Sequence, residues 1–123
     1  MLSFFTKYYQ AILWSFISLF ACGVNGNSFP HVSFDIGIDK IAHFVLFGMQ
    51  SFLIAFAYHQ DKKNTNWNNI HLSVLIGILY GVLIEFLQYA IFINRSFDYA
   101  DMLADALGAC SIYLWAFFRG KFK

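Results

Sequence analysis

The sequence predicts an all-α integral membrane protein, a bundle of four transmembrane helices with cytoplasmic N- and C-termini. Two observations predict this class. The composition is 59% hydrophobic and only 12% charged, against roughly 45–50% and 25% in soluble domains, and the apolar residues gather in four long runs. A soluble fold of 123 residues has too little interior to bury so many apolar side chains. Lipid is therefore the expected solvent, and residues 1–123 are expected to form one domain.

The first two helices are expected at residues 8–24 and 41–58. The first ends before a turn that begins at Asn25 and contains the only proline, Pro30, because Asn-Gly and proline interrupt helices. The second ends at the polar loop 59–69. Each run is expected to be helical because lipid offers no partner to a free backbone N–H or C=O group.

The third and fourth helices are expected at residues 72–93 and 101–118. Each run approaches the roughly 20 residues that cross a hydrocarbon layer about 30 Å thick. The third contains the GxxxG pattern 77-GILYG-81, and small residues at this spacing allow helices to pack closely in lipid. Gly81 lies one turn before Glu85, so the pattern predicts that Glu85 faces a neighbouring helix.

The basic residues indicate how the chain is oriented in the membrane. With the N-terminus inside, six of the eight lie on the inner side and two on the outer side, as the positive-inside rule requires. The inner set is Lys7, Lys62, Lys63, Arg119, Lys121 and Lys123, and the outer set is Lys40 and Arg95. We therefore expect a multi-pass protein with both termini in the cytoplasm.

Net charge and cysteine content argue against two other classes of function. The net charge is +1, which gives no electrostatic basis for binding nucleic acid. Cys22 and Cys110 lie in separate apolar runs without metal-ligand spacing, so we expect packing residues rather than a disulfide. The stretch 19-LFAC-22 is similar to a lipoprotein cleavage signal, but the bulky Phe20 favours a membrane helix instead.

A glutamate lies inside the third apolar run, in 81-GVLIEFLQ-88. A charged carboxylate near the middle of a membrane costs roughly 2.5–3.5 kcal/mol, so Glu85 is expected to face the bundle interior and to find partners there. With the orientation given above, the polar residues of the other runs fall in the same outer half. The sequence therefore predicts an outward-facing polar pocket lined by Asp39, Lys40, His43, Glu85, Gln88, Arg95, Asp101 and Asp105.

The roles of these residues stay open at this point. Glu85 is expected to be functional, with a structural hydrogen bond between helices as the alternative. His43 is a candidate general base, metal ligand or hydrogen-bond partner. With Glu85, Asp101 and Asp105 it could offer one nitrogen and several oxygens to a metal, but no HExxH spacing is present. No metal, cofactor or catalytic residue is therefore predicted.

Three strings on consecutive expected helices resemble the VanZ-like family of small bacterial membrane proteins: 39-DKIAHF-44, 80-YGVLIEFLQ-88 and 95-RSFDYADMLADALGA-109. The resemblance covers about residues 36–112 and maps the family motif onto the predicted pocket residues and Gly108. It implies a multi-pass protein of the bacterial cytoplasmic membrane and a link to resistance against the glycopeptide antibiotic teicoplanin. Asp105 stands where the family often has Asn.

The resemblance and the predicted pocket lead to one expected function and two alternatives. We expect a cell-envelope protein whose pocket binds a membrane lipid or a lipid-linked envelope precursor. The alternatives are a membrane-embedded enzyme acting on a lipid-linked substrate and a purely structural or interaction protein. The sequence leaves the identity of the ligand, any catalysis and the oligomeric state open.

Overall fold

The computed structural model describes residues 2–23, 37–62, 66–91 and 99–119. These residues form four helices, which are α1 Leu2–Gly23, α2 Gly37–Lys62, α3 Trp67–Ala90 and α4 Tyr99–Arg119. The predicted all-α class is confirmed. Two predicted site residues fall outside this description: Arg95 lies in a segment that is not described, and of Asp39 only the helical backbone is described.

Each helix extends beyond its apolar run at one or both ends. α1 begins at Leu2 rather than at residue 8, and α3 begins at Trp67 rather than at residue 72. Polar side chains do not stop a helix, because its backbone hydrogen bonds are internal. The start of α3 is instead set by Asn66, whose side chain accepts a hydrogen bond of 3.0 Å from the backbone N–H of Asn69, as an N-cap residue does.

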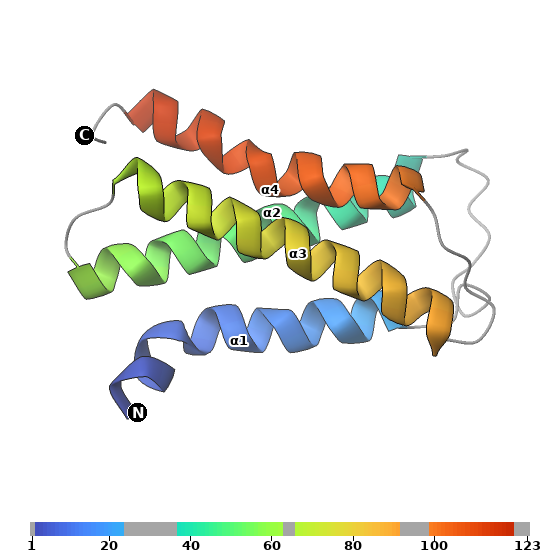
Figure 1. Ribbon diagram of the computed structural model, residues 1–123, viewed down its shortest axis with the longest axis horizontal. Helices are drawn as coiled ribbons and strands as arrows, with labels where there is room; N and C mark the ends of the chain where they lie inside the picture. The colour runs from blue at the N-terminus through green and yellow to red at the C-terminus, as the bar shows by residue number, and fades with distance from the viewer. Residues whose placement is uncertain (1, 24–36, 63–65, 92–98, 120–123) are drawn as a thin grey trace.

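The four helices form a bundle in which α1 lies at one edge (Figure 1). α4 packs most extensively against α2 and next against α3, whereas α1 contacts α2 and, to a lesser extent, α3. Within the described residues α1 does not contact α4. α1 begins and α4 ends at one end of the bundle, and α2 and α4 begin at the opposite end (Figure 1).

Three of the helices are long and apolar enough to cross a membrane, over Lys40–Gln60, Trp67–Ala90 and Tyr99–Phe118. α1 is not among them, because Lys7 and Gln10 lower the hydropathy of its first half. α1 nevertheless runs along the bundle beside the other three (Figure 1). Three spans are thus confirmed as candidates, while the fourth span and the orientation of the termini stay predictions.

The glycine pattern of α3 brings this helix close to its neighbours. A Cβ added to Gly81 would lie 2.8 Å from the Cβ of Asp105 in α4, and one added to Gly77 would collide with the hydroxyl of Ser51 in α2. Gly77, Gly81 and Glu85 all lie on the buried face of α3. The GxxxG prediction is therefore confirmed, including the face on which Glu85 lies.

α2 and α4 approach each other even more closely, at Gly108. A Cβ added to Gly108 would fall onto the backbone carbonyl of Phe44, and one added to Gly48 would lie 3.0 Å from the carbonyl oxygen of Gly108. Only glycine leaves room for two helix backbones at such a crossing. This crossing fixes the N-terminal halves of α2 and α4 against each other, and those halves carry Lys40, His43, Asp101 and Asp105.

Apolar side chains fill the rest of the interior and also cover much of the surface. The larger core cluster lies toward the end where α4 finishes and consists of Ala55, Ile70, Val74, Ala109, Ile112 and Ala116. On the surface, Phe20 is 77% exposed and Leu107 is 54% exposed. Exposed apolar residues of this size along whole helices fit a lipid environment rather than water.

Candidate functional site

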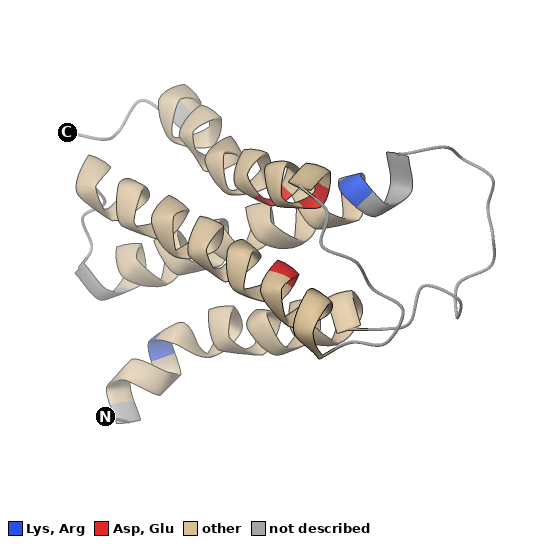
Figure 2. Ribbon diagram, turned by 45° about the vertical axis from the view of Figure 1, so that its right-hand side comes forward, with Lys and Arg blue, Asp and Glu red and all other residues tan. Residues whose placement is uncertain are grey.

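Five ionisable side chains from three helices meet in one half of the bundle. We call this set the polar cluster, and it consists of Lys40 and His43 from α2, Glu85 from α3, and Asp101 and Asp105 from α4. Figure 2 shows the acidic residues of the described chain gathered on α3 and α4, near the end where α2 and α4 begin. The sequence prediction that these five residues come together is therefore realised in the fold.

His43 lies at the centre of the polar cluster. Its Nδ1 atom is 2.7 Å from Oδ1 of Asp105, which is hydrogen-bonding distance, and 3.8 Å from Oε1 of Glu85. Its Nε2 atom, on the other side of the ring, is 3.8 Å from Oδ2 of Asp101. The imidazole thus lies among three carboxylates contributed by two different helices.

Exposure falls steadily from the mouth of the cluster to its interior. Lys40, at the mouth, donates to Oδ1 of Asp101 at 3.1 Å, and its side chain is 30% exposed. The side chain of His43 is 3% exposed, that of Asp105 is 1% exposed and that of Glu85 is fully buried. Charged groups are buried in proteins only where charges or hydrogen bonds compensate them, so the cluster is a specific polar arrangement and not a solvated surface.

Helix geometry explains why these residues converge. Asp101 and Asp105 are four positions apart on α4, and Lys40 and His43 are three positions apart on α2, so each pair shares one helical face. The glycine contacts of α3 and α4 bring those faces together, since Gly81 lies directly against Asp105. The cluster is thus built by close packing of helices that carry acids one turn apart.

Gln88 was predicted as a pocket residue, and the structure gives it a different neighbour. Its side chain is buried one turn beyond Glu85, where Nε2 donates to the backbone carbonyl of Cys22 at 2.8 Å. This bond joins α3 to α1. In the described structure Gln88 therefore joins two helices.

Three more side chains attach α1 to the bundle in the same way, and the sequence did not predict this role for any of them, since Trp14 was expected to be a lipid-facing or interfacial anchor. Trp14 donates from Nε1 to the carbonyl of Leu46 at 2.8 Å. The hydroxyl of Tyr80 donates to the carbonyl of Ser15, and Gln50 donates weakly to the carbonyl of Ala11 at 3.4 Å and to the hydroxyl of Ser15 at 3.0 Å. The available signal was Gln50, an amide in the middle of an apolar run.

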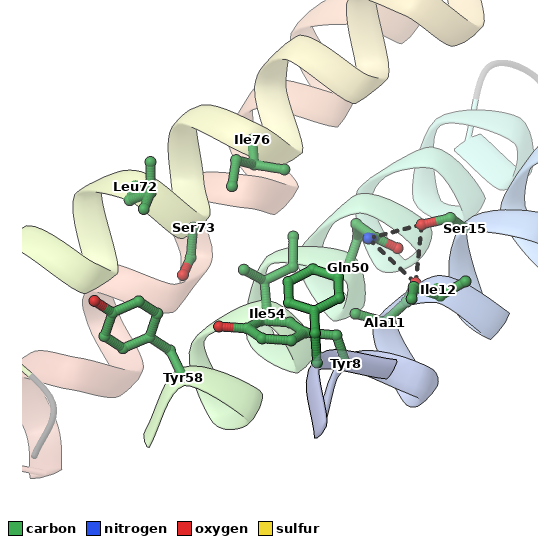
Figure 3. Close-up of a pocket in the computed structure, with 11 residues that line it drawn as sticks. Tyr8, Ala11, Ile12, Ser15, Gln50, Ile54, Tyr58, Leu72, Ser73 and Ile76 are labelled. Atoms are coloured by element: carbon green, nitrogen blue, oxygen red, sulfur yellow. Dashed lines mark hydrogen bonds between the residues drawn. The ribbon is translucent and has the colours of Figure 1, made fainter. Parts of the chain in front are cut away.

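A pocket of about 320 Å³ lies between α1, α2 and α3, away from the polar cluster (Figure 3). Figure 3 shows the amide of Gln50 at one side of this space and the rings of Tyr8 and Tyr58 at another. Its lining is mostly apolar and consists of Phe4, Tyr8, Ala11, Ile12, Ser15, Gln50, Ile54, Tyr58, Leu72, Ser73 and Ile76. This volume is at the lower end of the range for ligand pockets.

The polar cluster is able to perform two kinds of chemistry. A histidine hydrogen-bonded to a carboxylate can hold and transfer a proton, and an imidazole among carboxylates can bind a cation. Fold and site together define a small helical membrane protein with an ionisable cluster buried between its spans.

The chain belongs to the VanZ/LLP1 family, whose family model matches residues 2–119. The predicted resemblance is thereby confirmed, and the match extends it to α1 and to the end of α4. Neither the comparison with curated proteins nor the comparison with solved structures found a match.

Proposed function

We propose that this VanZ-like membrane protein resides in the bacterial cytoplasmic membrane and binds the polar head of a lipid or lipid-linked envelope component at its polar cluster. The proposal depends mainly on one observation: a partly exposed lysine at the mouth of the cluster leads to buried polar side chains between the spans. Ionisable residues inside membrane helices are costly, so they are retained mostly where they serve a function.

The parts of the cluster suggest how such a head group is recognised. Lys40 supplies a positive charge near the membrane surface, and Arg95, which follows α3 in sequence, is the other basic residue expected at this end. An anionic phosphate is the natural partner of such groups. The acids deeper in the cluster accept hydrogen bonds from hydroxyl or amide groups of the ligand. In the proposed orientation, the cluster opens to the outer leaflet.

Lipid co-purification tests this proposal. The wild-type protein and the variants Lys40→Met, Arg95→Ala and Lys7→Met are purified in a mild detergent, and bound lipids are quantified by mass spectrometry. Lys7 lies on α1, at the far end of the bundle from the polar cluster, so Lys7→Met is the matched control. We expect a loss of about tenfold or more in one lipid class for Lys40→Met and Arg95→Ala. Identical lipid profiles in all four proteins would contradict the proposal.

The link to antibiotic resistance is tested in cells. A deletion strain is expected to become more sensitive to teicoplanin, and the wild-type gene should restore resistance. Glu85→Gln and Arg95→Ala should fail to restore it while accumulating to wild-type levels in the membrane. If both variants fully restored resistance, the polar cluster would have no role in resistance to teicoplanin.

A second candidate function is a membrane enzyme, which the His43–Asp105 pair favours. The 2.7 Å contact places a carboxylate behind Nδ1, and this arrangement orients an imidazole so that Nε2 can act as a general base. Such an enzyme would convert a lipid-linked substrate in membrane extracts, and His43→Gln would abolish the conversion. A wild-type protein that leaves every extracted lipid unchanged by mass spectrometry would exclude this candidate.

A further inference from the structure

We propose that His43, Glu85 and Asp105 form a binding site for one divalent transition-metal ion. Zn²⁺ and Mn²⁺ are the ions that this combination of side chains fits best. The site lies in the buried interior of the polar cluster, and binding of a metal there does not require that a lipid binds at Lys40.

The three side chains already lie at nearly the spacing that a metal requires. Each offers one ligand atom, and these atoms all lie within 4.8 Å of one another. Metal–nitrogen and metal–oxygen bonds are about 2.0–2.2 Å long, so two ligands of one ion are at most about 4.4 Å apart. The contacts of Nδ1 of His43 with Asp105, 2.7 Å, and with Glu85, 3.8 Å, fall within that limit. The carboxylate oxygens of Glu85 and Asp105 lie within 4.8 Å of each other, so these two side chains would move closer together around an ion.

The ligand types select a class of metal. Carboxylates alone suit Mg²⁺ and Ca²⁺, whereas imidazole together with carboxylates suits Zn²⁺, Mn²⁺ and Fe²⁺. Three protein ligands on three separate helices leave at least one coordination position open, as in catalytic rather than purely structural sites. His43, Glu85 and Asp105 are all buried, so the ion would lie in a site shielded from water.

Asp101 supplies a second observation that points to a metal. Histidines that bind a metal through one ring nitrogen almost always donate the other N–H to a carboxylate or carbonyl, which orients the ring. Here Nε2 of His43 faces Asp101 at 3.8 Å, and Asp101 is in turn held by Lys40 at 3.1 Å. At 3.8 Å, Nε2 and the carboxylate oxygen are farther apart than a hydrogen bond allows, so Asp101 is the carboxylate placed to accept from Nε2 once the ring shifts on binding the ion.

The charge balance of the cluster also favours a cation. Among the described side chains of the cluster there are three carboxylates, those of Glu85, Asp101 and Asp105. The one ammonium group beside them is that of Lys40. An excess of negative charge between membrane helices is costly, and a divalent ion in place of the proton at Nδ1 offsets it.

The test is metal binding by the purified full-length protein in detergent. The protein is stripped with EDTA and dialysed, and Zn²⁺, Mn²⁺ or Mg²⁺ is then added. Bound metal is counted by elemental mass spectrometry, and the midpoint of thermal unfolding is recorded. We expect one Zn²⁺ or Mn²⁺ per chain, a midpoint that rises with the concentration of either ion, and a much weaker response to Mg²⁺.

Variants then locate the ion. His43→Gln, Glu85→Gln and Asp105→Asn should each lower the affinity for Zn²⁺ by more than about 100-fold, and Asp101→Asn, which removes the carboxylate placed to accept from Nε2, by about 10–100-fold. The matched control is His71→Gln. His71 is an exposed histidine of α3 at the other end of the bundle, where its Nδ1 lies 2.8 Å from the hydroxyl of Tyr113, so this variant should bind Zn²⁺ as the wild type does.

Three results would overturn the site. They are a wild-type protein without stoichiometric metal or a thermal response, a stability that depends on pH but not on any metal, and unchanged Zn²⁺ affinity in all the cluster variants. If a ligand variant does not yield a monodisperse protein, the Zn²⁺ affinities of the wild type and Asp101→Asn are compared instead. Equal affinities would then overturn the site. Because lipid content is measured separately, loss of the metal proposal leaves the lipid proposal testable, and the converse also holds.

Discussion

Glu85 shows how one residue can distinguish a functional cluster from a structural one. Its carboxylate is fully buried and lies 3.8 Å from Nδ1 of His43. Glutamine has the same shape and can still hydrogen-bond, so the loss of stability in Glu85→Gln is expected to stay near the net value of one hydrogen bond, about 0.5–1.5 kcal/mol. The charge and the metal-ligating ability are lost.

We therefore expect Glu85→Gln to fold normally and to lose the envelope phenotype. Chemical unfolding in detergent measures its free energy of unfolding, and teicoplanin susceptibility of the complemented deletion strain measures its function. A variant that keeps both stability and phenotype would support the purely structural alternative. A variant that fails to reach the membrane would show that the carboxylate is needed for folding.

For Gln88 we expect the opposite result, a loss of stability without a loss of metal binding, because its hydrogen bond joins α3 to α1. Replacing it with leucine removes the donor to the carbonyl of Cys22, and single interhelical hydrogen bonds in membrane proteins contribute about 0.6 kcal/mol on average and up to about 1.7. Gln88→Leu is expected to lower the free energy of unfolding by that amount and to leave Zn²⁺ affinity unchanged. A drop in Zn²⁺ affinity as large as that of Glu85→Gln would contradict this expectation and would mean that Gln88 takes part in the polar cluster.

At the scale of helices, the crossing of α2 and α4 at Gly108 holds the polar cluster in register. An alanine there would place its Cβ on the carbonyl of Phe44, so the helices would have to separate. Overpacking of this kind typically costs about 1–3 kcal/mol. We expect Gly108→Ala to destabilise the protein by that amount and to weaken Zn²⁺ binding as well, since Asp101 and Asp105 move with α4.

The control for this prediction is Leu107→Ala. Leu107 is the preceding residue of α4, and its side chain is 54% exposed, so its truncation should leave metal affinity unchanged. Thermal unfolding and Zn²⁺ titration on the same preparations compare the two variants. If Gly108→Ala and the wild type had the same unfolding midpoint and the same Zn²⁺ affinity, α2 and α4 could move apart at this crossing without harm, and the prediction would be wrong.

The comparison of sequence with structure is also clearest at the scale of helices. The runs of apolar residues predicted four helices, and the spacing of Gly77, Gly81 and Glu85 predicted the buried face of α3. These features depend on local periodicity, which a sequence records directly. The convergence of Lys40, His43 and the acids was also predictable, because buried charges in lipid require partners.

The partner of each polar side chain was not predictable from the sequence. Asp105 makes a hydrogen bond to His43 at 2.7 Å, and the amide of Gln88 donates to a carbonyl of α1. These choices depend on how far each helix is rotated about its axis, which the packing of glycines and large side chains decides. α1 is not among the candidate spans for a different reason: its second half is apolar, but Lys7 and Gln10 lie in the first, so its crossing of the membrane stays a prediction.

At the scale of the whole molecule, the arrangement of the helices leads to a prediction about membrane topology. α1 runs beside the three candidate spans and begins at the end where α4 finishes (Figure 1), which favours four crossings with both termini on one side. The six-to-two division of basic residues predicts that this side is the cytoplasm. In a background with Cys22→Ser and Cys110→Ser, Ser3→Cys and Ser96→Cys form a matched pair for labelling.

A membrane-impermeant maleimide should label Ser96→Cys in intact cells and should label Ser3→Cys only after the cells are permeabilised. Labelling of both variants in intact cells would mean that α1 does not cross the membrane. Labelling of Ser3→Cys alone in intact cells would mean that the orientation is inverted and that the polar cluster opens to the cytoplasm.

The attachment of α1 has an evolutionary consequence. Ala11, Ser15 and Cys22 accept hydrogen bonds from α2 and α3 through their backbone carbonyls, and every amino acid carries that group. Replacing these three side chains with others of similar size therefore preserves the carbonyl acceptors, and the one acceptor lost is the hydroxyl of Ser15, to which Gln50 also donates. Divergence should consequently be tolerated more readily on this face of α1 than at the donors Gln50, Tyr80 and Gln88, where only a few residue types can supply the proton.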